Sequence, residues 1–130
     1  MSRLTSLKLA VVGFVLLMML AVTGVQAREW VTETAQTTIH MTQLPRQGVE
    51  MYQLILQGGP FVHEKDGVVF ANRERLLPRA PRGHYHEYTV RTPGVSHRGT
   101  RRIVCAGLSR APDACYYTAD HYASFRRIVP

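Results

Sequence analysis

The sequence predicts an α+β fold in which one main helix packs on a twisted antiparallel sheet. Residues 45–57 form an amphipathic segment, and short stretches rich in aromatic and β-branched residues follow between residues 68 and 128. A chain of 130 residues provides one small domain and has no room for a second. We therefore expect the helix to cover one face of the sheet and a site to occupy the open face.

The N-terminal residues 1–27 are typical of a secretory signal peptide. Arg3 and Lys8 form a basic start, residues 9–22 are apolar and uncharged, and Ala27 is a small residue suited to cleavage. An uncleaved membrane anchor is the alternative, but the apolar run is shorter than the roughly 20 residues that a spanning helix needs. Cleavage would leave a lead-in at residues 28–43 and the main domain at residues 44–130, with no stable membrane association.

The charge of the exported part favours a polyanionic target. Of the 16 Lys and Arg residues, two lie in the leader, which leaves 14 against nine Asp and Glu and a net charge of +5. All but Lys65 are arginines, and the planar guanidinium matches phosphate geometry better than an ammonium does. Charge also promotes solubility, so this feature alone does not establish binding to RNA.

Cys105 and Cys115 are the two cysteines, an even number in a chain that we expect to be exported. Residues 106–114 between them contain turn-forming residues and predict a loop between two strands. We expect a disulfide, which contributes roughly 2 to 3 kcal/mol by closing so short a loop. No paired Cys or His ligands stand at zinc spacing, so we expect neither a metal nor another cofactor.

The elements follow in order. The helix begins near Pro45, which suits a first turn, and ends where Gly58 and Pro60 interrupt it. Strands are expected at residues 68–70, 85–90, 100–104 and 124–128, with a turn at residues 92–94. A polar run of Asn72, Arg73 and Glu74 follows the first strand. It is either a charged loop or a turn whose amides and carboxylate read a guanine edge beside an aromatic side chain.

Two of these strands place unlike charges together. Side chains alternate faces along a strand, so any antiparallel register that sets Glu87 opposite an even-numbered residue gathers Glu87, Arg98 and Arg102. A solvated salt bridge is one interpretation of this cluster. The other is a phosphate-binding site with a catalytic carboxylate, because two arginines beside one glutamate leave a net positive charge. His121, in a polar turn before the last strand, is the best-placed histidine for acid–base chemistry.

These residues resemble the secreted microbial guanyl-specific ribonucleases, in the bacterial branch that includes barnase. The matching blocks occur in order over nearly all of the chain beyond Leu44: Leu44-Pro45, Gly59-Pro60-Phe61, Asp66-Gly67-Val68-Val69-Phe70, Asn72-Arg73-Glu74, Leu77-Pro78, Tyr85-His86-Glu87-Tyr88-Thr89-Val90, Thr92-Pro93-Gly94, Arg98-Gly99-Thr100-Arg101-Arg102-Ile103, Tyr116-Tyr117-Thr118 and Asp120-His121-Tyr122. The resemblance implies the α+β microbial ribonuclease fold.

The resemblance also implies metal-independent cleavage of RNA 3′ to guanosine, first to a 2′,3′-cyclic phosphate and then to a 3′-phosphate. Glu87 would be the general base and His121 the general acid, with Arg98 and Arg102 stabilising charge on phosphorus. Five residues are implied to bind the substrate: Phe70, Asn72, Arg73, Glu74 and Tyr122. If a small acidic inhibitor of this protein exists, like barstar for barnase, we expect it to cover the arginine-rich face. We also expect a monomer.

Two other functions remain open. A basic RNA-binding or antimicrobial protein without turnover would need neither Glu87 nor His121. A toxin acting on competitor cells would keep both, so the chemistry does not separate a toxin from a scavenging nuclease.

Overall fold

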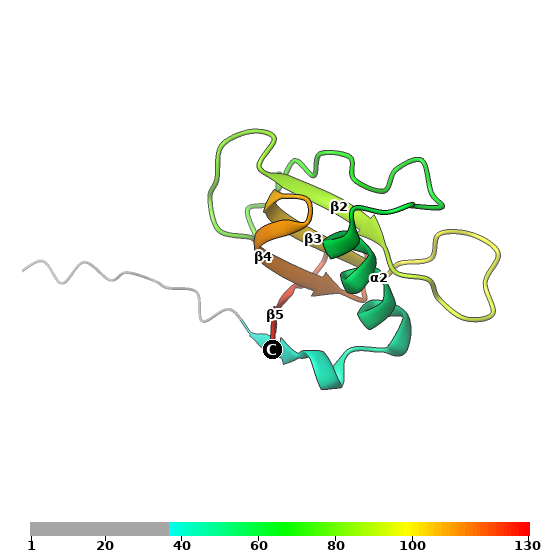
Figure 1. Cartoon of the computed structure of the whole chain (residues 1–130). Helices are drawn as coiled ribbons and strands as arrows, with labels where there is room; N and C mark the ends of the chain where they lie inside the picture. Colours follow the sequence, from blue (N-terminus) through cyan, green and yellow to red (C-terminus); the bar gives the residue numbers. More distant parts are fainter. Residues whose placement is uncertain (1–36) are drawn as a thin grey trace, which may run out of the picture. The chain divides into compact units, whose positions relative to one another are not determined.

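The computed structural model describes residues 37–130, so the predicted signal peptide and most of the lead-in lie outside the described residues. Figure 1 shows one helix beside a sheet. The elements in chain order are β1 (Thr38–His40), the 3₁₀ turn η1 (Met41–Gln43), α2 (Arg46–Gln57), β2 (Tyr85–Thr89), β3 (Arg102–Leu108), β4 (Ala111–Thr118) and β5 (Arg126–Val129). Within this part of the chain, no helix is long and apolar enough to cross a membrane.

Helix α2 agrees with the predicted helix to within one residue. Pro45 lies immediately before it, and the Pro45 carbonyl accepts hydrogen bonds from the N–H groups of Gly48 and Val49 at 2.8 and 3.1 Å. Proline suits this position because its missing N–H would have no helical partner there. Gly58 ends the helix at φ 84°, a left-handed conformation that glycine adopts without strain.

The sheet has the order β1-β5-β4-β3-β2. Its β2–β3, β3–β4 and β4–β5 pairs are antiparallel, as expected, but β1 pairs with β5 in parallel. The predicted antiparallel sheet is confirmed for these three pairs, and β1 adds a parallel edge strand that the sequence did not predict. The lead-in shows no clear alternation of polar and apolar residues. Its last residues form a strand because they pair with the C-terminal strand β5, where Arg127 N–H donates to the Thr37 carbonyl at 2.8 Å. Tertiary pairing, not local pattern, makes this strand.

The two cysteines join neighbouring strands. Cys105 on β3 lies directly opposite Cys115 on β4, and the two form a disulfide, which confirms the predicted bond. The loop predicted between them is wrong, because β3 and β4 extend through most of it and reverse around Arg110, at φ 70°. Gly107 and Pro112 are turn formers, but the register shifts between Ala106 and Gly107, and such a bulge accommodates both.

The other strands differ from their predicted bounds mainly at the ends. The strand expected at residues 100–104 begins at Arg102, and the one expected at 124–128 begins at Arg126. The strand expected at residues 68–70 is reduced to a single bridge between Val69 and His86. Even so, this segment follows the outer edge of β2, because Phe70 N–H donates to the Tyr85 carbonyl at 2.9 Å and Glu87 N–H to the Val68 carbonyl at 3.0 Å.

Two clusters of buried residues cover the two faces of the sheet. Under α2, Ile55 packs with Ile103 and Tyr117, and the disulfide lies in the same cluster. The opposite face carries Leu77, Tyr85, Val104, Ala106 and Tyr116. Val104 pairs with Glu87 and alternates with Ile103 along β3. Glu87 and Arg102 therefore lie on the face opposite the helix.

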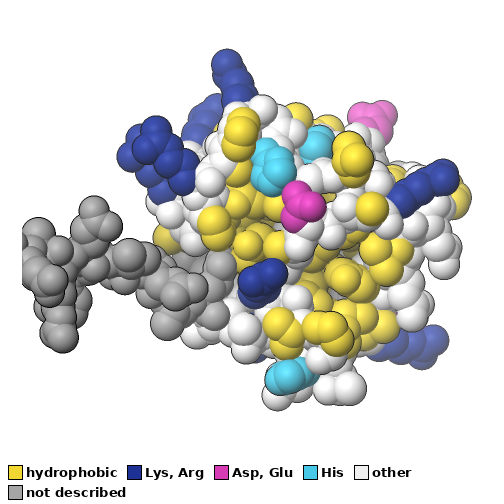
Figure 2. Space-filling view, turned by 60° about the vertical axis from the view of Figure 1, so that its left-hand side comes forward, with side chains coloured by type: hydrophobic (Ala, Val, Ile, Leu, Met, Phe, Trp, Pro, Cys, Tyr) yellow, Lys and Arg dark blue, Asp and Glu magenta, His cyan; other side chains and the backbone are white. Residues whose placement is uncertain are grey.

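The surface is mixed in character. Figure 2 shows apolar side chains across the middle of one face, while Lys and Arg side chains lie mainly around its outline. The positive charge is therefore dispersed around this face and does not form a single patch on it.

Four tyrosines in the two clusters, Tyr85, Tyr88, Tyr116 and Tyr117, predict a loss of stability in alkali. Burial raises the pKa of each above the usual 10.0. Because the pKa of each tyrosine is raised in the folded state, the unfolded chain releases these protons first as the pH rises. The contribution of each tyrosine to stability is therefore complete below pH 10 and is lost as the pH rises further. We expect the free energy of unfolding, measured with urea from pH 8 to 11, to fall above pH 10.

Tyrosinate absorbance provides the control for this prediction. The four phenols should ionise together with unfolding, above pH 10. Their full ionisation near pH 10 in protein that is still folded would contradict it.

Candidate active site

A loop at residues 70–77, hereafter the base loop, follows the segment that pairs with the edge of β2. Asn72 closes it with its own side chain: Nδ2 donates to the Leu77 carbonyl at 3.0 Å, and Oδ1 accepts from Leu77 N–H at 3.1 Å. Leu77 is buried and anchors the far end. Asn72 is left-handed at φ 50°, which asparagine tolerates better than most residues. Its amide side chain therefore shapes the loop, and Arg73 and Glu74 remain exposed.

Glu87 is a nearly buried carboxylate with two partners. Its side chain is 12% exposed; Oε1 accepts from Arg98 Nη2 at 3.3 Å, and Oε2 accepts from the Tyr122 hydroxyl at 2.8 Å. The structure therefore brings Glu87 and Arg98 together, as the sequence predicts. The solvated salt bridge does not fit, because both side chains are largely buried.

Arg98 contacts Glu87 for a different reason from the predicted alternation of side chains along a strand. It lies in the loop between β2 and β3, and not on a strand. Its Nε donates to Thr89 Oγ1 at 3.0 Å, which fixes the guanidinium against β2. The expected proximity is correct, but its cause is the loop. Thr89 is a positioning residue that the sequence analysis missed.

Arg102 is a fixed, buried cation, 2% exposed. Its Nη1 donates to the carbonyls of Arg101 and Arg98, at 2.7 and 3.3 Å, and its Nε donates to the Tyr122 hydroxyl at 3.2 Å. The Tyr122 hydroxyl therefore lies between the guanidinium of Arg102 and the carboxylate of Glu87. Burial raises the pKa of Tyr122, and its hydrogen bond to Glu87 raises it further. The phenol consequently remains a hydrogen-bond donor at neutral pH.

The turn that carries His121 is held by Asp120. One Asp120 oxygen accepts from the Thr118 hydroxyl at 2.8 Å and from Ser124 N–H at 2.9 Å, and the other accepts from the Ser124 hydroxyl. The hydrogen bond from the Ser124 side chain is the main cause of a lowered pKa for Asp120. His121 N–H donates to the Thr100 carbonyl at 3.0 Å, and both His121 and Tyr122 have positive φ, at 53° and 70°. An Asp followed four residues later by Ser is the pattern in the sequence that could have indicated this side-chain-stabilised turn.

Aromatic rings connect the turn to the base loop. Phe70 stacks on Tyr122 with ring centroids 5.1 Å apart, and Phe125 meets Phe70 edge-on at 5.9 Å. The His121 ring lies 4.8 Å from that of Tyr122. Phe70 and Tyr122 were predicted from the sequence, but Phe125 was not, because it falls within the strand expected at residues 124–128.

One cavity of about 410 Å³ gathers most of the predicted site. Eleven residues line it: Val69, Phe70, Ala71, Asn72, Arg73, Glu74, Leu76, Glu87, His121, Tyr122 and Phe125. All five predicted substrate-binding residues are among them, together with Glu87 and His121. Arg98 and Arg102 are not in the lining but contact Glu87 and Tyr122 beside it. We refer to this cavity as the site cavity.

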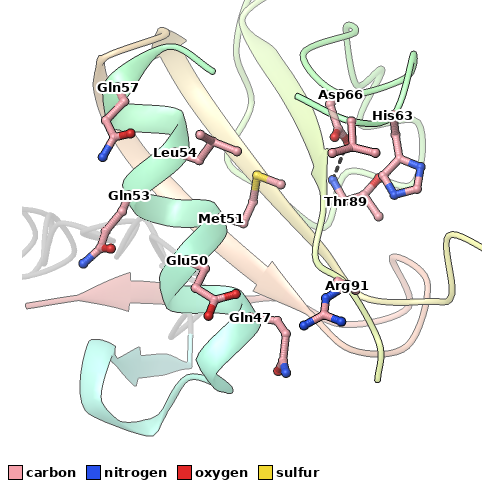
Figure 3. Close-up of a pocket in the computed structure, with 11 residues that line it drawn as sticks. Gln47, Glu50, Met51, Gln53, Leu54, Gln57, His63, Asp66, Thr89 and Arg91 are labelled. Atoms are coloured by element: carbon pink, nitrogen blue, oxygen red, sulfur yellow. Dashed lines mark hydrogen bonds between the residues drawn. The ribbon is translucent and has the colours of Figure 1, made fainter. Parts of the chain in front are cut away.

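A separate hollow of about 460 Å³ lies between α2 and β2 (Figure 3). Met51 and Leu54 point into it from the helix, opposite His63 and Asp66. The dashed contact is structural, because Asp66 Oδ1 accepts from Thr89 N–H at 2.7 Å and ties its loop to β2. Although this hollow is slightly larger, it contains none of the predicted site residues. Among residues 37–130, no three His, Cys, Asp or Glu side chains form a group that could hold a metal ion.

Comparison with known proteins decides the family. The profile of the ribonuclease family matches residues 27–129. The chain belongs to the ribonuclease family. Guanyl-specific ribonuclease Sa of Kitasatospora aureofaciens is 48% identical over 91 residues, which cover 70% of this chain and 92% of that relative. Guanyl-specific ribonuclease Sa3 of the same organism is 58% identical over 85 residues, which cover 65% of this chain and 58% of that relative.

A solved structure of ribonuclease Sa2 with guanosine-2′-cyclophosphate shares the fold. It is 44% identical, has a TM-score of 0.66, and the match covers 73% of this chain and 97% of that one. The resemblance found in the sequence is thereby confirmed for both family and fold.

Replacing Tyr122 tests how the cluster is held. In Tyr122→Phe, the ring stacked on Phe70 is retained, but Glu87 and Arg102 lose their shared hydroxyl. We expect a loss of about 1 kcal/mol in the free energy of unfolding, the usual contribution of one such hydrogen bond. Tyr122→Ala loses the ring as well and should be destabilised further. Urea unfolding measures both, and equal losses in the two variants would contradict a packing role for the ring.

Proposed function

We propose that this protein is an endoribonuclease that cleaves single-stranded RNA 3′ to guanosine, through a 2′,3′-cyclic phosphate that it then hydrolyses to a 3′-phosphate. One observation carries the proposal. A carboxylate and an imidazole, Glu87 and His121, line the same cavity as the base loop. Membership of the ribonuclease family, and relatives named as guanyl-specific, support it.

The first step is a transfer of the phosphoryl group within the RNA. Ionised Glu87 takes the proton of the 2′-hydroxyl, and O2′ attacks phosphorus while the bond from phosphorus to O5′ breaks. Protonated His121 gives its proton to the departing O5′. The products are a 2′,3′-cyclic phosphate and a free 5′-hydroxyl. In the second step, the oxygen of a water molecule attacks phosphorus and the bond from phosphorus to O2′ breaks. His121 takes a proton from that water, and Glu87 gives its proton to the departing O2′. DNA is not a substrate because it lacks the 2′-hydroxyl nucleophile.

The arginines supply positive charge that persists through the reaction. Once Glu87 has taken a proton it is neutral, so Arg98 and Arg102 no longer face an anion of the protein. Their charge is then directed to the negative charge developing on the phosphorane. Arg102 is already fixed by two backbone carbonyls, so it does not need to reorganise when that charge forms.

Guanine recognition is assigned to the base loop. The exposed carboxylate of Glu74 accepts from guanine N1–H and N2–H₂, while the backbone amides of Asn72 and Arg73 donate to O6. Phe70 and Tyr122, already stacked on one another, provide the aromatic contacts. Adenine would present a donor where guanine presents O6, so it should bind poorly.

Three dinucleotides test the reaction. In EDTA, we expect cleavage of GpA with release of cyclic guanosine phosphate, and far slower cleavage of ApA and UpA. Glu87→Gln and His121→Ala should each lower kcat by about 10² to 10⁴, as loss of a general base or acid does. Glu74→Gln should reduce the preference for GpA while leaving cleavage itself in place.

The outcomes separate the alternatives. Salt-sensitive RNA binding without turnover would favour the non-catalytic RNA-binding or antimicrobial protein. Equal cleavage of all three dinucleotides would remove the guanine-reading role of Glu74. Full activity in His121→Ala would show that another group protonates O5′.

Export is part of the proposal. The basic and apolar leader and Ala27 support cleavage after residue 27. The mass of protein collected from the medium, after expression of the whole sequence in a secreting bacterium, should correspond to a chain that begins at Arg28. Full-length protein retained in the membrane fraction would favour the anchor instead.

A further inference from the structure

A third hollow adjoins the site cavity across the base loop. It measures about 460 Å³ and shares residues 69–73 with the site cavity, so the two form neighbouring spaces on either side of one loop. Glu87 and His121 do not line it. On its far side it is bounded by residues 79–83, which connect the base loop to β2. We call this space the arginine groove.

The charge of the groove has one sign. Arg73, Arg75, Arg79 and Arg82 line it, and its lining contains no Asp or Glu. All four are exposed. Within residues 37–130, the ion pairs are Arg46–Glu50, His84–Asp113 and Arg98–Glu87, so none of the four is neutralised by a carboxylate there. Four guanidinium groups around one hollow match the charge and the planar geometry that phosphate contacts require.

The segment that carries two of these arginines is held in place. Between Arg79 and Arg82, Ala80 packs against the buried cluster on the open face of the sheet. The buried Tyr85 donates from its hydroxyl to the Pro78 carbonyl, and His84 N–H donates to the Pro81 carbonyl at 3.1 Å. Proline at positions 78 and 81 further restricts the backbone. The two arginines thus extend from an anchored segment, which reduces the entropy lost when they bind a ligand.

We propose that the arginine groove binds the phosphates of the RNA strand on the 5′ side of the cleaved guanosine. This inference rests on the proposed function. RNA can leave the guanosine in only two directions. On the 3′ side, the scissile phosphate and the departing nucleoside must lie with Glu87 and His121 in the site cavity. The site cavity is thus taken by the guanosine and the nucleoside on its 3′ side. The RNA on the 5′ side of the guanosine would then pass over the base loop and enter the groove directly beyond it.

Two tetranucleotides of equal charge test the proposal. UpUpGpA and GpApUpU each contain one guanosine and three phosphates, but the extension lies upstream in the first and downstream in the second. The dinucleotide GpA has neither extension. The test variant is Arg79→Gln with Arg82→Gln, which removes two charges outside the site cavity. The control variant, Arg91→Gln with Arg127→Gln, removes two exposed charges that line neither the site cavity nor the groove.

The test variant should lower kcat/KM for UpUpGpA about three- to tenfold. Its kcat/KM for GpA and for GpApUpU should stay within about twofold of the values for the unmodified protein. The salt dependence for UpUpGpA should also become shallower by about one unit of slope, because phosphate contacts release counterions. The control variant should change all three substrates equally or not at all.

The possible failures are distinct. If the unmodified protein does not cleave GpA, the proposed function fails. If it cleaves GpA, but the test variant loses as much on GpA or on GpApUpU as on UpUpGpA, then the groove is not an upstream subsite. Unchanged kinetics for UpUpGpA in the test variant would also overturn the proposal.

Discussion

The nearly buried carboxylate of Glu87 is the constraint around which this structure is arranged. A charge removed from water is costly unless opposite charges and hydrogen-bond donors surround it. Here the partners come from three other parts of the chain: Arg98 from the loop before β3, Tyr122 from the turn before β5, and Arg102, through the Tyr122 hydroxyl, from β3. Satisfying one carboxylate therefore fixes two loops against the open face of the sheet. The same groups are then available in one place for chemistry.

This arrangement is better explained by function than by stability. Buried ion pairs often contribute little compared with well-packed apolar residues, because desolvation offsets their attraction. Arg102 is buried and held by backbone carbonyls, and together with Arg98 it supplies more positive charge than Glu87 can neutralise. A fold selected only for stability has no need of that surplus. In the proposed reaction, the phosphoryl group of the substrate would bring the missing negative charge.

The sequence predicted the parts of the fold that depend on local chemistry and regular alternation. Proline before α2 and glycine after it set that helix, and the even register of Glu87 with Val104 placed Arg102 on the same face. Features that depend on distant partners were not predictable. The edge strand β1 forms because β5 lies beside it. Arg98 reaches Glu87 from a loop, whose residues do not alternate between two faces as those of a strand do. The β3–β4 hairpin replaces a predicted loop because a bulge absorbs Gly107 and Pro112, and residue preferences alone do not reveal a bulge.

Backbone hydrogen bonds connect the base loop to the strand that carries Glu87. Glu87 N–H donates to the Val68 carbonyl and Phe70 N–H to the Tyr85 carbonyl, so Phe70, which begins the base loop, and Glu87, the proposed general base, share one short ladder along β2. The Asn72 side chain then closes the loop by bonding to the backbone of Leu77. A base proposed to bind in the site cavity would therefore be positioned by the same strand as the carboxylate that we propose to act on its ribose. Because residues 69–73 also border the arginine groove, this ladder positions both the site cavity and the groove, the two spaces that we propose a bound strand to occupy.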